Sequence, residues 1–504
     1  MARTLALLTS LLVAGISLLS AQAPAVDPRK TVQALEAVVV QVVREAEGSV
    51  VGLLVVRGEP YDEPPKDHPG RLGAFPASER ERQAARKAPH LDLGHPRHVA
   101  EYYGSGVVID ARGLILTPYH VVRDARKVYV RLPGGTGSYA DIHAADPRSD
   151  LAVLQLLDPS LPLKPLPLGD AGRMRKGQFV VALAHPYAGG NRDGTPSASW
   201  GILSNVRQRP PGDADRGSLT LHHHGTLLLT DVRLPHATSG GALLNLHGEL
   251  IGLTTALPVL TDTESAGRYA VPLDAAMKRV VGVLAAGREV EYGFLGVSTR
   301  DVPAEEMRAF GVTEGAVVVN EEVTPGTPAA RAGLRRGDII LAVNGTRVRD
   351  GDELFLAVGT TLAGSPAELE IIRDRQRRSV TVKELAKYGT VGPVIAARRP
   401  PPVRGLRADY LTVLLAQIPL GRRDLHDRLA FALRQGGVVL VEVQPGGPAQ
   451  RAGLQPQDNI THVNDRPVDS PAEFHRELQA APGPVQLTLL PLNEKSPPRK
   501  LRLE

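Results

Sequence analysis

Three polar residues, His120, Asp150 and Ser239, stand along the chain in local contexts that suit nucleophilic catalysis. His120 lies in L-T-P-Y-H-V-V, Asp150 in D-P-R-S-D-L-A-V-L and Ser239 in T-S-G-G-A-L-L-N. A serine hydroxyl is a weak nucleophile until an imidazole takes its proton, and a carboxylate holds that imidazole in the required tautomer. Together these residue types therefore indicate acyl-transfer chemistry at Ser239.

The elements around these residues are predicted to bring them together. Residues 113–117 predict a buried strand that delivers His120 to the rim of a barrel, and 150–156 predict a strand that begins at Asp150. Ser239 precedes two glycines, which leave room for substrate. The chain order His, Asp, Ser is that of chymotrypsin-type enzymes. The alternative is that three unrelated polar residues occur in an ordinary β-protein.

Short β-rich segments separated by turn residues recur through the first half of the chain. Such spacing is typical of a β-barrel or a β-sandwich. Helical spacing of apolar residues predicts helices over 31–46 and 272–286, and 58–98 predict a long surface loop because they carry many Pro and charged residues. The predicted strands cover 49–56, 104–110, 113–117, 127–132, 150–156, 178–184, 199–206, 226–232 and 248–254.

The second half of the chain holds an internal repeat. P-G-T-P-A-A-R-A-G-L-R-R-G-D-I-I-L-A-V-N-G (325–345) matches P-G-G-P-A-Q-R-A-G-L-Q-P-Q-D-N-I-T-H-V-N-D (445–465) without a gap. Two copies of one module are therefore expected. The segment R-R-P-P-P-V-R-G (398–405) between them predicts a semi-rigid linker.

Composition narrows the classes of function. The 504 residues carry a formal charge of +5, spread along the chain, which is too dilute to indicate nucleic-acid binding. No cysteine is present, so disulfides, thiolate metal sites and a cysteine nucleophile are excluded. The histidines at 222–224 and in the 58–98 loop lack metal-ligand spacing and are interpreted as surface residues. No cofactor or metal is predicted.

The N-terminus is typical of an exported protein. A basic start, an apolar stretch and A-Q-A at 21–23 predict a signal peptide over 1–23, cleaved after Ala23. An uncleaved membrane anchor is the alternative, although the apolar stretch is short for a spanning helix. With cleavage, no stable membrane span is expected. The protein is then expected in the periplasm or outside the cell.

These motifs resemble the HtrA/DegP-type serine proteases, and the resemblance covers nearly everything after the signal. Its most specific parts are the three contexts above, Asp231, G-I-L-S (201–204) and the two P-A-x-R-A-G-L repeats. The resemblance implies Ser239 as nucleophile, His120 as general base and acid, and Asp150 as orienting carboxylate. It implies a mainly β fold: a chymotrypsin-like double β-barrel protease domain followed by two α+β PDZ domains. The boundaries expected are 24–48 for an N-terminal helical segment, 49–290 for the protease, 291–388 and 404–504 for the PDZ domains, and 389–403 for the Pro-rich linker.

Two departures from the family pattern concern the active site. Ala237 replaces the usual glycine whose N–H, with that of Ser239, would form the oxyanion hole; a positive φ at alanine costs about 1 kcal/mol. Loss of one donor typically costs about 100- to 1,000-fold in rate. The resemblance also places Arg233 and Leu234 at the substrate pocket. Arg233 either closes that pocket, favours an acidic residue, or turns away to pair with Asp231 or Asp193.

The PDZ resemblance implies a peptide-binding loop in the first module. The backbone N–H groups of Leu295, Gly296 and Val297, in F-L-G-V, would capture a C-terminal carboxylate, and the peptide would add to a sheet edge. A helix over 352–358 would form the other wall of the groove. In the second module Arg407 replaces the loop glycine, so weaker or altered carboxylate binding, or a docking role, is expected there.

Taken together, these features predict an exported serine endopeptidase that degrades unfolded or damaged envelope proteins, with PDZ domains that bind peptide C-termini. The resemblance also implies a homotrimer as a possible assembly. The alternative is a peptide-binding scaffold or chaperone with an impaired or latent protease domain, which Ala237 favours. A third possibility is a purely structural β-protein, which would mean that the local contexts of His120, Asp150 and Ser239 arose by coincidence.

Overall fold

A computed structural model describes residues 27–57, 93, 100, 102–158, 162–186, 194–209, 220–233, 239–255, 269–389, 394–418, 423–491 and 497–504. The predicted signal peptide lies outside these residues, as does all of the predicted 58–98 loop except Leu93. In the described part of the chain, no helix combines the length and the apolarity needed to span a bilayer.

The first barrel is formed by six antiparallel strands that follow one another along the chain. The strand order is β5-β4-β1-β2-β3-β6, and pairing of β5 with β6 closes the barrel. Val51, Leu53 and Ile115 are fully buried within it, as the apolar runs of β1 and β3 predict. The strands are β1 (Val50–Arg57), β2 (Tyr102–Asp110), β3 (Leu114–Pro118), β4 (Ala125–Arg131), β5 (Gly137–Asp146) and β6 (Leu151–Leu156).

A second closed barrel follows, in the order β10-β11-β12-β9-β8-β7. One apolar core joins Leu116 and Leu151 of the first barrel to Leu183 and Leu253 of the second, and α5 (Ala275–Ala285) covers it through Leu284. The segments that carry the catalytic candidates therefore lie next to a core that the two barrels share. The strands are β7 (Phe179–Ala184), β8 (Ser197–Gln208), β9 (Leu227–Thr230), β10 (Ala242–Leu244), β11 (Leu250–Thr255) and β12 (Tyr269–Pro272).

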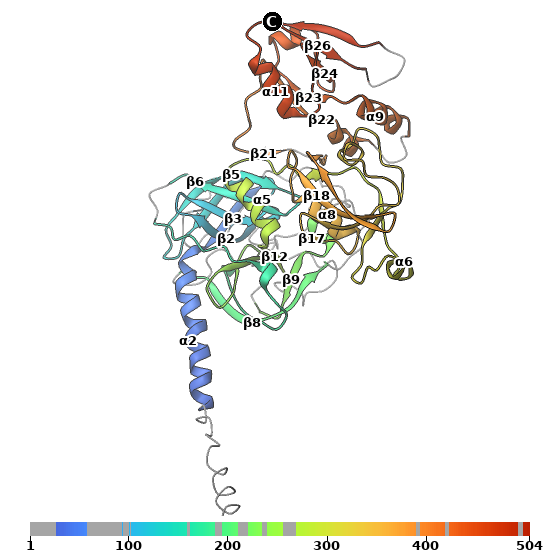
Figure 1. Ribbon diagram of the computed structural model, residues 1–504. Coiled ribbons are helices and arrows are strands. Elements are labelled where there is room, and N and C mark those ends of the chain that lie inside the picture. Colours follow the sequence, from blue (N-terminus) through green and yellow to red (C-terminus); the bar gives the residue numbers. More distant parts are fainter. Residues whose placement is uncertain are drawn as a thin grey trace, which may run out of the picture.

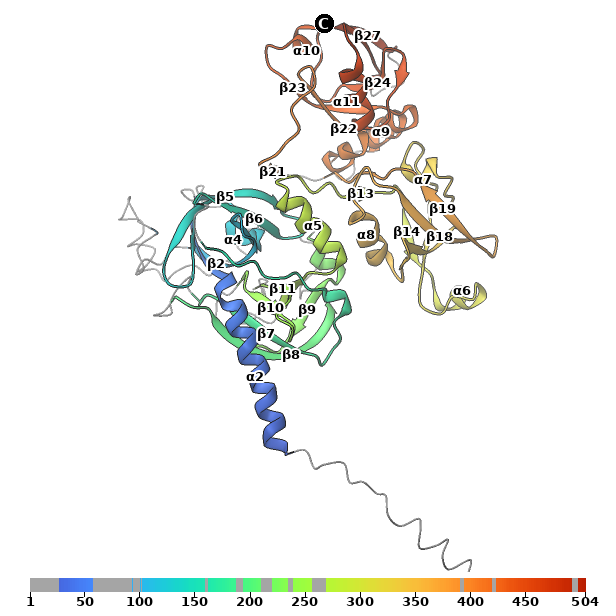
Figure 2. The same cartoon turned by 60° about the vertical axis from the view of Figure 1, so that its left-hand side comes forward.

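Helix α2 (Pro28–Ala46) precedes the barrels and projects away from them (Figures 1 and 2). Its first turn is fixed by Pro28 and by Asp27, whose side chain accepts a hydrogen bond from the Arg29 N–H. Val42 and Ala46 are buried against the body, whereas Val32 is 65% exposed. Only the C-terminal end of the helix is therefore packed on its own chain.

The two repeat copies fold alike. Their sheets run β14-β15-β16-β18-β19 and β22-β23-β24-β26-β27, with β17 and β25 at equivalent places on β16 and β24. The first copy comprises β13 (Gly293–Phe294), β14 (Thr299–Asp301), α6 (Ala304–Ala309), β15 (Val317–Val319), α7 (Pro328–Arg331), β16 (Ile339–Val343), β17 (Thr346–Arg347), α8 (Gly351–Gly359), β18 (Ala367–Arg373), β19 (Gln376–Val382) and β20 (Ala386–Lys387). The second comprises β22 (Leu406–Tyr410), α9 (Arg423–Gln435), β23 (Val438–Val443), α10 (Pro448–Arg451), β24 (Asn459–Val463), β25 (Arg466–Pro467), α11 (Pro471–Ala480), β26 (Val485–Leu489) and β27 (Arg499–Leu503). The second copy lies at the opposite end of the molecule from α2 (Figure 1).

The segment between the copies does more than link them. Within it, β21 (Ile395–Ala396) pairs with β5, with Ile395 opposite Ala145 and Ala396 opposite Ala144. Just before this segment, buried Lys387 forms ion pairs with Glu289, Glu291 and Asp409, at 2.8, 3.1 and 2.9 Å. The segment expected to be a Pro-rich linker is thus partly docked on the first barrel.

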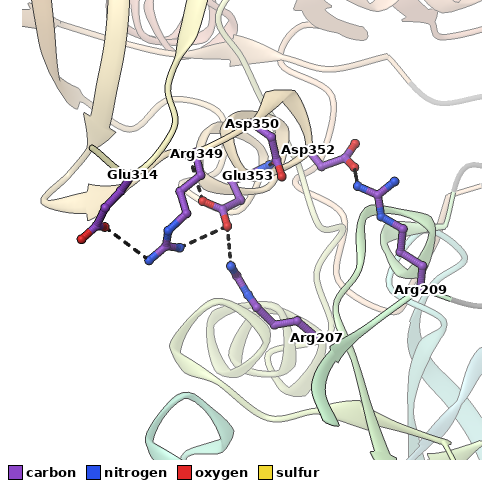
Figure 3. Close-up of polar contacts among 7 residues, drawn as sticks. All are labelled: Arg207, Arg209, Glu314, Arg349, Asp350, Asp352 and Glu353. Carbon is purple, nitrogen blue, oxygen red and sulfur yellow. Dashed lines mark hydrogen bonds and ion pairs between the residues drawn. The ribbon is translucent and has the colours of Figure 1, made fainter. Parts of the chain in front are cut away.

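The first copy also contacts the second barrel, through the N-terminal end of α8 (Figure 3). Arg207 and Arg209, which lie on and just after β8, form ion pairs with Glu353 and Asp352 of α8. His224 Nδ1 lies 2.7 Å from Asp352 Oδ1, and the His224 ring stacks on Phe355 with centroids 4.4 Å apart. His224 therefore lies at an interface and His222 is buried, which corrects the interpretation of these two histidines as surface residues.

Candidate active site

His120 lies on the short helix α4 (Tyr119–Val122), which follows β3 directly. Two contacts fix its position relative to Asp150: its backbone N–H donates to Asp150 Oδ1 at 2.9 Å, and its Nδ1 lies 2.7 Å from Asp150 Oδ2. The other ring nitrogen, Nε2, is buried and has no hydrogen-bond partner among the described residues. Nε2 is therefore the atom on which His120 is able to accept a proton.

Asp150 lies at the turn before β6 in a left-handed conformation, with φ of 53°. Its carbonyl accepts a hydrogen bond from the Tyr119 N–H at 2.9 Å, so both its backbone and its side chain hold α4. Burial acts to raise the pKa of the Asp150 carboxyl, but the His120 ring, with a smaller contribution from His222, outweighs burial and lowers it. The carboxylate is thus ionised at neutral pH although it is buried.

Ser239 is 2% exposed and begins the turn that leads into β10. Its carbonyl accepts a hydrogen bond from the Ser105 N–H at 2.7 Å. Gly240 has φ of 90°, and a Cβ there would lie 1.9 Å from the Ser105 carbonyl oxygen. Only glycine fits this position, because a side chain would collide with β2.

Close contacts place this turn against the His120 helix. A Cβ on Gly104 would lie 2.7 Å from Val121 Cγ1 and 3.1 Å from the Ser239 carbonyl oxygen, so β2 separates the two by the width of a glycine. A Cβ on Gly240 would lie 3.0 Å from Pro118 Cδ. The neighbours of His120 and of Ser239 therefore meet at the junction of the two barrels. The pairing of the Ser239 hydroxyl with His120 Nε2 stays a prediction.

The other residues predicted for this site are only partly described. Ala237 and Leu234 lie outside the described residues. Arg233 is exposed, and its backbone N–H donates to Ser199 Oγ at 3.1 Å. Asp231 Oδ1 accepts a hydrogen bond from the Ile202 N–H at 2.6 Å. A Cβ on Gly201 would lie only 2.2 Å from this oxygen, so the contact requires glycine at that position. Asp231 thus holds strand β8 at Ile202.

His222 is a residue of this site that the sequence interpretation missed. It is 1% exposed, its Nδ1 lies 3.3 Å from Thr226 Oγ1, and its electrostatic interaction with Asp150 helps to lower the pKa of that carboxyl. Its neighbour Leu221 donates its N–H to the Arg148 carbonyl at 2.8 Å. The only sequence signal was the histidine run itself, and three consecutive histidines do not reveal which of them is buried.

In the first repeat copy, the F-L-G-V loop is shaped by Gly296. This residue has φ of 86°, and a Cβ there would lie 2.5 Å from Thr327 Cβ. The Leu295 side chain is buried, and its carbonyl accepts from the Ala329 N–H at 2.9 Å. Among the described residues, the N–H groups of Leu295, Gly296 and Val297 donate no hydrogen bond. Strand β14, which follows, lies at the edge of its sheet.

The second copy differs at the equivalent place. The Ala408 N–H of its edge strand β22 donates to His475 Nε2 of α11 at 3.4 Å, so strand and helix are directly bridged. Arg407 Nε lies 2.9 Å from Glu442 Oε2.

Comparison with known proteins gives the same organisation. The trypsin-like peptidase domain family matches residues 104–253, and PDZ domain families match 293–383 and 439–490. A probable periplasmic serine endoprotease DegP-like of Pseudomonas fluorescens is 32% identical over 397 residues, which are 78% of this chain and 77% of the relative. The periplasmic pH-dependent serine endoprotease DegQ of Escherichia coli is 32% identical over 402 residues, which are 79% of this chain and 80% of the DegQ chain.

Among solved structures, an HtrA-type protease AlgW with tripeptide is 24% identical, with a TM-score of 0.48, and the match covers 72% of this chain and 98% of that one. The family matches and the relatives confirm the prediction of a double-barrel serine protease followed by two PDZ domains. The individual site residues and the domain boundaries stay predictions.

Proposed function

The chain belongs to the DegP/DegQ family of serine endoproteases, and we propose from this that it is a periplasmic endopeptidase that degrades unfolded or damaged envelope proteins through Ser239. The observation that carries the proposal is the double contact between Asp150 and His120, at 2.9 and 2.7 Å, beside the turn that begins at Ser239. With the Ser239 hydroxyl, the carboxylate and the imidazole of this pair are the three groups that serine proteolysis needs.

In the proposed reaction, His120 Nε2 takes the proton of the Ser239 hydroxyl as its oxygen attacks the scissile carbonyl carbon. The tetrahedral intermediate collapses to an acyl-enzyme, and the protonated ring gives its proton to the leaving amine. Water then attacks the ester, with His120 again acting as base, and Ser239 is regenerated. Asp150 holds the proton on Nδ1 and stabilises the positive ring that forms at each step.

The oxyanion hole is proposed to use the N–H groups of Ala237 and Ser239. The backbone next to Ser239 is held by a hydrogen bond, because the Gly240 N–H donates to the Thr254 carbonyl at 2.7 Å. This contact supports a fixed position for the Ser239 N–H. At Ala237 the required positive φ would cost about 1 kcal/mol. A penalty of this size is smaller than the binding energy of a peptide substrate, so the hole is able to form when substrate is bound.

The first PDZ domain is proposed to bind the C-terminal carboxylate of a substrate peptide. Three N–H groups at the Leu295–Val297 loop that donate no hydrogen bond within the described chain, followed by the edge strand β14, support this role. The second PDZ domain is proposed to have a docking role instead, because the bridge from Ala408 to His475 stands where a peptide strand would lie.

Labelling with a fluorophosphonate and digestion of casein test the catalytic proposal, since labelling needs an activated serine and an oxyanion hole. The full chain is expected to be labelled and to digest casein, and Ser239→Ala to do neither. Ala237→Gly is expected to raise the rate if the alanine strains the hole. Casein digestion that survives in Ser239→Ala would overturn the assignment of the nucleophile.

A further inference from the structure

The loop from Asp146 to Asp150 joins β5 to β6 and carries the proposed catalytic carboxylate. Its first residue organises it: the Asp146 carboxylate accepts hydrogen bonds from the Ser149 N–H at 2.9 Å and from the Arg148 N–H at 3.4 Å. Its last residue, Asp150, has a left-handed backbone, which costs a non-glycine residue about 1 kcal/mol. The loop therefore needs support from its surroundings to keep Asp150 in place.

Part of this support comes from the ends of the segment 291–388 expected for the first PDZ domain, just outside the residues 293–383 that match the PDZ family. The Tyr292 hydroxyl, directly before β13, donates to Asp146 Oδ2 at 2.5 Å. Tyr292 is fully buried, and burial together with the Asp146 carboxylate raises the pKa of its hydroxyl well above the usual value. The hydroxyl is therefore protonated at all physiological pH values, so it donates to Asp146 permanently.

Arg148, in the middle of the loop, is held by the same domain. Its guanidinium lies 5.0 Å from the centroid of the Tyr292 ring and 4.3 Å from that of Tyr388. It also donates to the Gly389 carbonyl at 3.4 Å. Farther along, β21 pairs with Ala144 and Ala145, the two residues that precede Asp146. Residues at both ends of this segment thus contact the loop, and β21, which follows it, pairs with the end of β5 just before the loop.

From these contacts we propose that Tyr292 and Arg148 are positioning residues for Asp150, so that the seated PDZ domain is part of what orients the catalytic carboxylate. The inference rests on the proposed triad and goes beyond it, because neither residue contacts substrate or His120. The path is short: Tyr292 holds Asp146, Asp146 holds the Ser149 N–H, and Ser149 precedes Asp150.

Removal of the Tyr292 hydroxyl is expected to act on turnover rather than on substrate binding. Asp146 is buried and would lose its strongest donor, and the loop would relax at its left-handed end. The contact of Asp150 Oδ2 with His120 Nδ1 would lengthen, and the positive ring of the transition state would be less stabilised. A displacement of this kind lowers kcat by between about 10- and 100-fold. KM is expected to change little.

Tyr292→Phe in the full chain tests the proposal, with Tyr388→Phe as its matched control. Both variants keep an aromatic ring against Arg148, but of these two tyrosines only Tyr292 has a described side-chain hydrogen bond to the loop. The measurements are kcat, KM and the pH dependence of kcat/KM on a fluorogenic casein peptide, well below each variant's Tm. Tyr292→Phe is expected to lower kcat and to move the acidic limb of the profile to lower pH. Tyr388→Phe is expected to match the unmodified chain.

A double-mutant cycle with Asp146→Asn adds a second test. If Tyr292 acts through Asp146, the double variant is no slower than Asp146→Asn alone. Unchanged kcat in Tyr292→Phe, an equal loss in Tyr388→Phe, or a loss of kcat with an unshifted pH profile and a lowered Tm would each overturn the proposal. Failure of the triad itself is distinguishable, because it would appear as hydrolysis that survives in Ser239→Ala.

Discussion

At the scale of single residues, Asp150 uses both carboxylate oxygens on His120, one on the backbone N–H and one on the ring. In Asp150→Asn, the amide oxygen still accepts from the backbone, but the amide nitrogen donates to Nδ1. Nε2 then carries the proton and no longer acts as the base. We expect kcat to fall by about 10⁴-fold at pH 7, with nearly unchanged KM. Steady-state kinetics with Ser239→Ala as the background measure this, and a loss below tenfold would contradict it.

The lowered pKa of Asp150 fixes the pH range in which this carboxylate matters. Because the folded pKa is depressed, ionised Asp150 contributes stability above the ordinary aspartate value of about 4, and this contribution is lost as pH falls through the lower folded pKa. We therefore do not expect Asp150 to take up a proton between pH 7 and 5, so a loss of activity in that range would have another cause.

The sequence predicted the three triad residues because each lies in a short local context, and the two contacts between Asp150 and His120 support two of them. It missed Tyr292, Arg148 and His222, because their roles depend on contacts between segments far apart in the chain. The expectation that His222 and His224 are surface residues was wrong for the same reason: the segment that carries them is held against distant parts of the chain, by the hydrogen bond of the Leu221 N–H to the Arg148 carbonyl and by the contact of His224 with Asp352.

At the scale of elements, the Leu295–Val297 loop depends on Gly296. Gly296→Ala would bring Cβ within 2.5 Å of Thr327 Cβ at φ of 86°. We expect affinity for a peptide with a free, apolar C-terminus to fall at least tenfold, which is about 1.4 kcal/mol. Gly345→Ala is the matched control, since its φ is 75° but nothing lies within 4 Å.

Fluorescence anisotropy with the peptide and with its C-terminal amide measures the effect. An equal loss in the Gly345 variant would attribute the change to backbone strain, and equal binding of acid and amide would contradict carboxylate capture by the loop.

Apolar runs such as 49–56 and 178–184 predicted strands close to β1 (Val50–Arg57) and β7 (Phe179–Ala184). Strands β5 and β21 were not predicted. Strand β5 alternates small and polar residues, with Ala140 buried and Asp141 exposed, and β21 has only two residues. Such a short strand forms only because the edge of β5 is available to it, which is a property of the assembled barrel and not of the Pro-rich segment.

At the scale of the whole molecule, the first PDZ domain is seated on the protease by two kinds of contact. Tyr292, Arg148 and β21 form a largely buried contact near the catalytic loop. The ion pairs of Arg207 and Arg209 with α8 form an exposed contact on the other barrel (Figure 3). Exposed pairs of this kind contribute about 0–1 kcal/mol each and are screened by salt. We therefore expect the buried contact to contribute most to the position of the domain, and the ion pairs, which lie beside the stack of His224 on Phe355, to restrain it further at low salt.

This division of roles predicts the outcome of removing the exposed contact alone. In Arg207→Ala/Arg209→Ala, we expect Tm to fall by no more than about 4 °C, since a loss of roughly 1 kcal/mol shifts the Tm of a domain of about 150–250 residues by about 2–4 °C. Spin-label distances between the second barrel and β19 are expected to broaden, as they would in the unmodified chain at 1 M salt. Arg377→Ala/Arg378→Ala removes the same charge from β19, away from the protease, and is expected to leave the distances unchanged at low salt. Equal broadening in both double variants would show that net charge, rather than the α8 contact, restrains the domain.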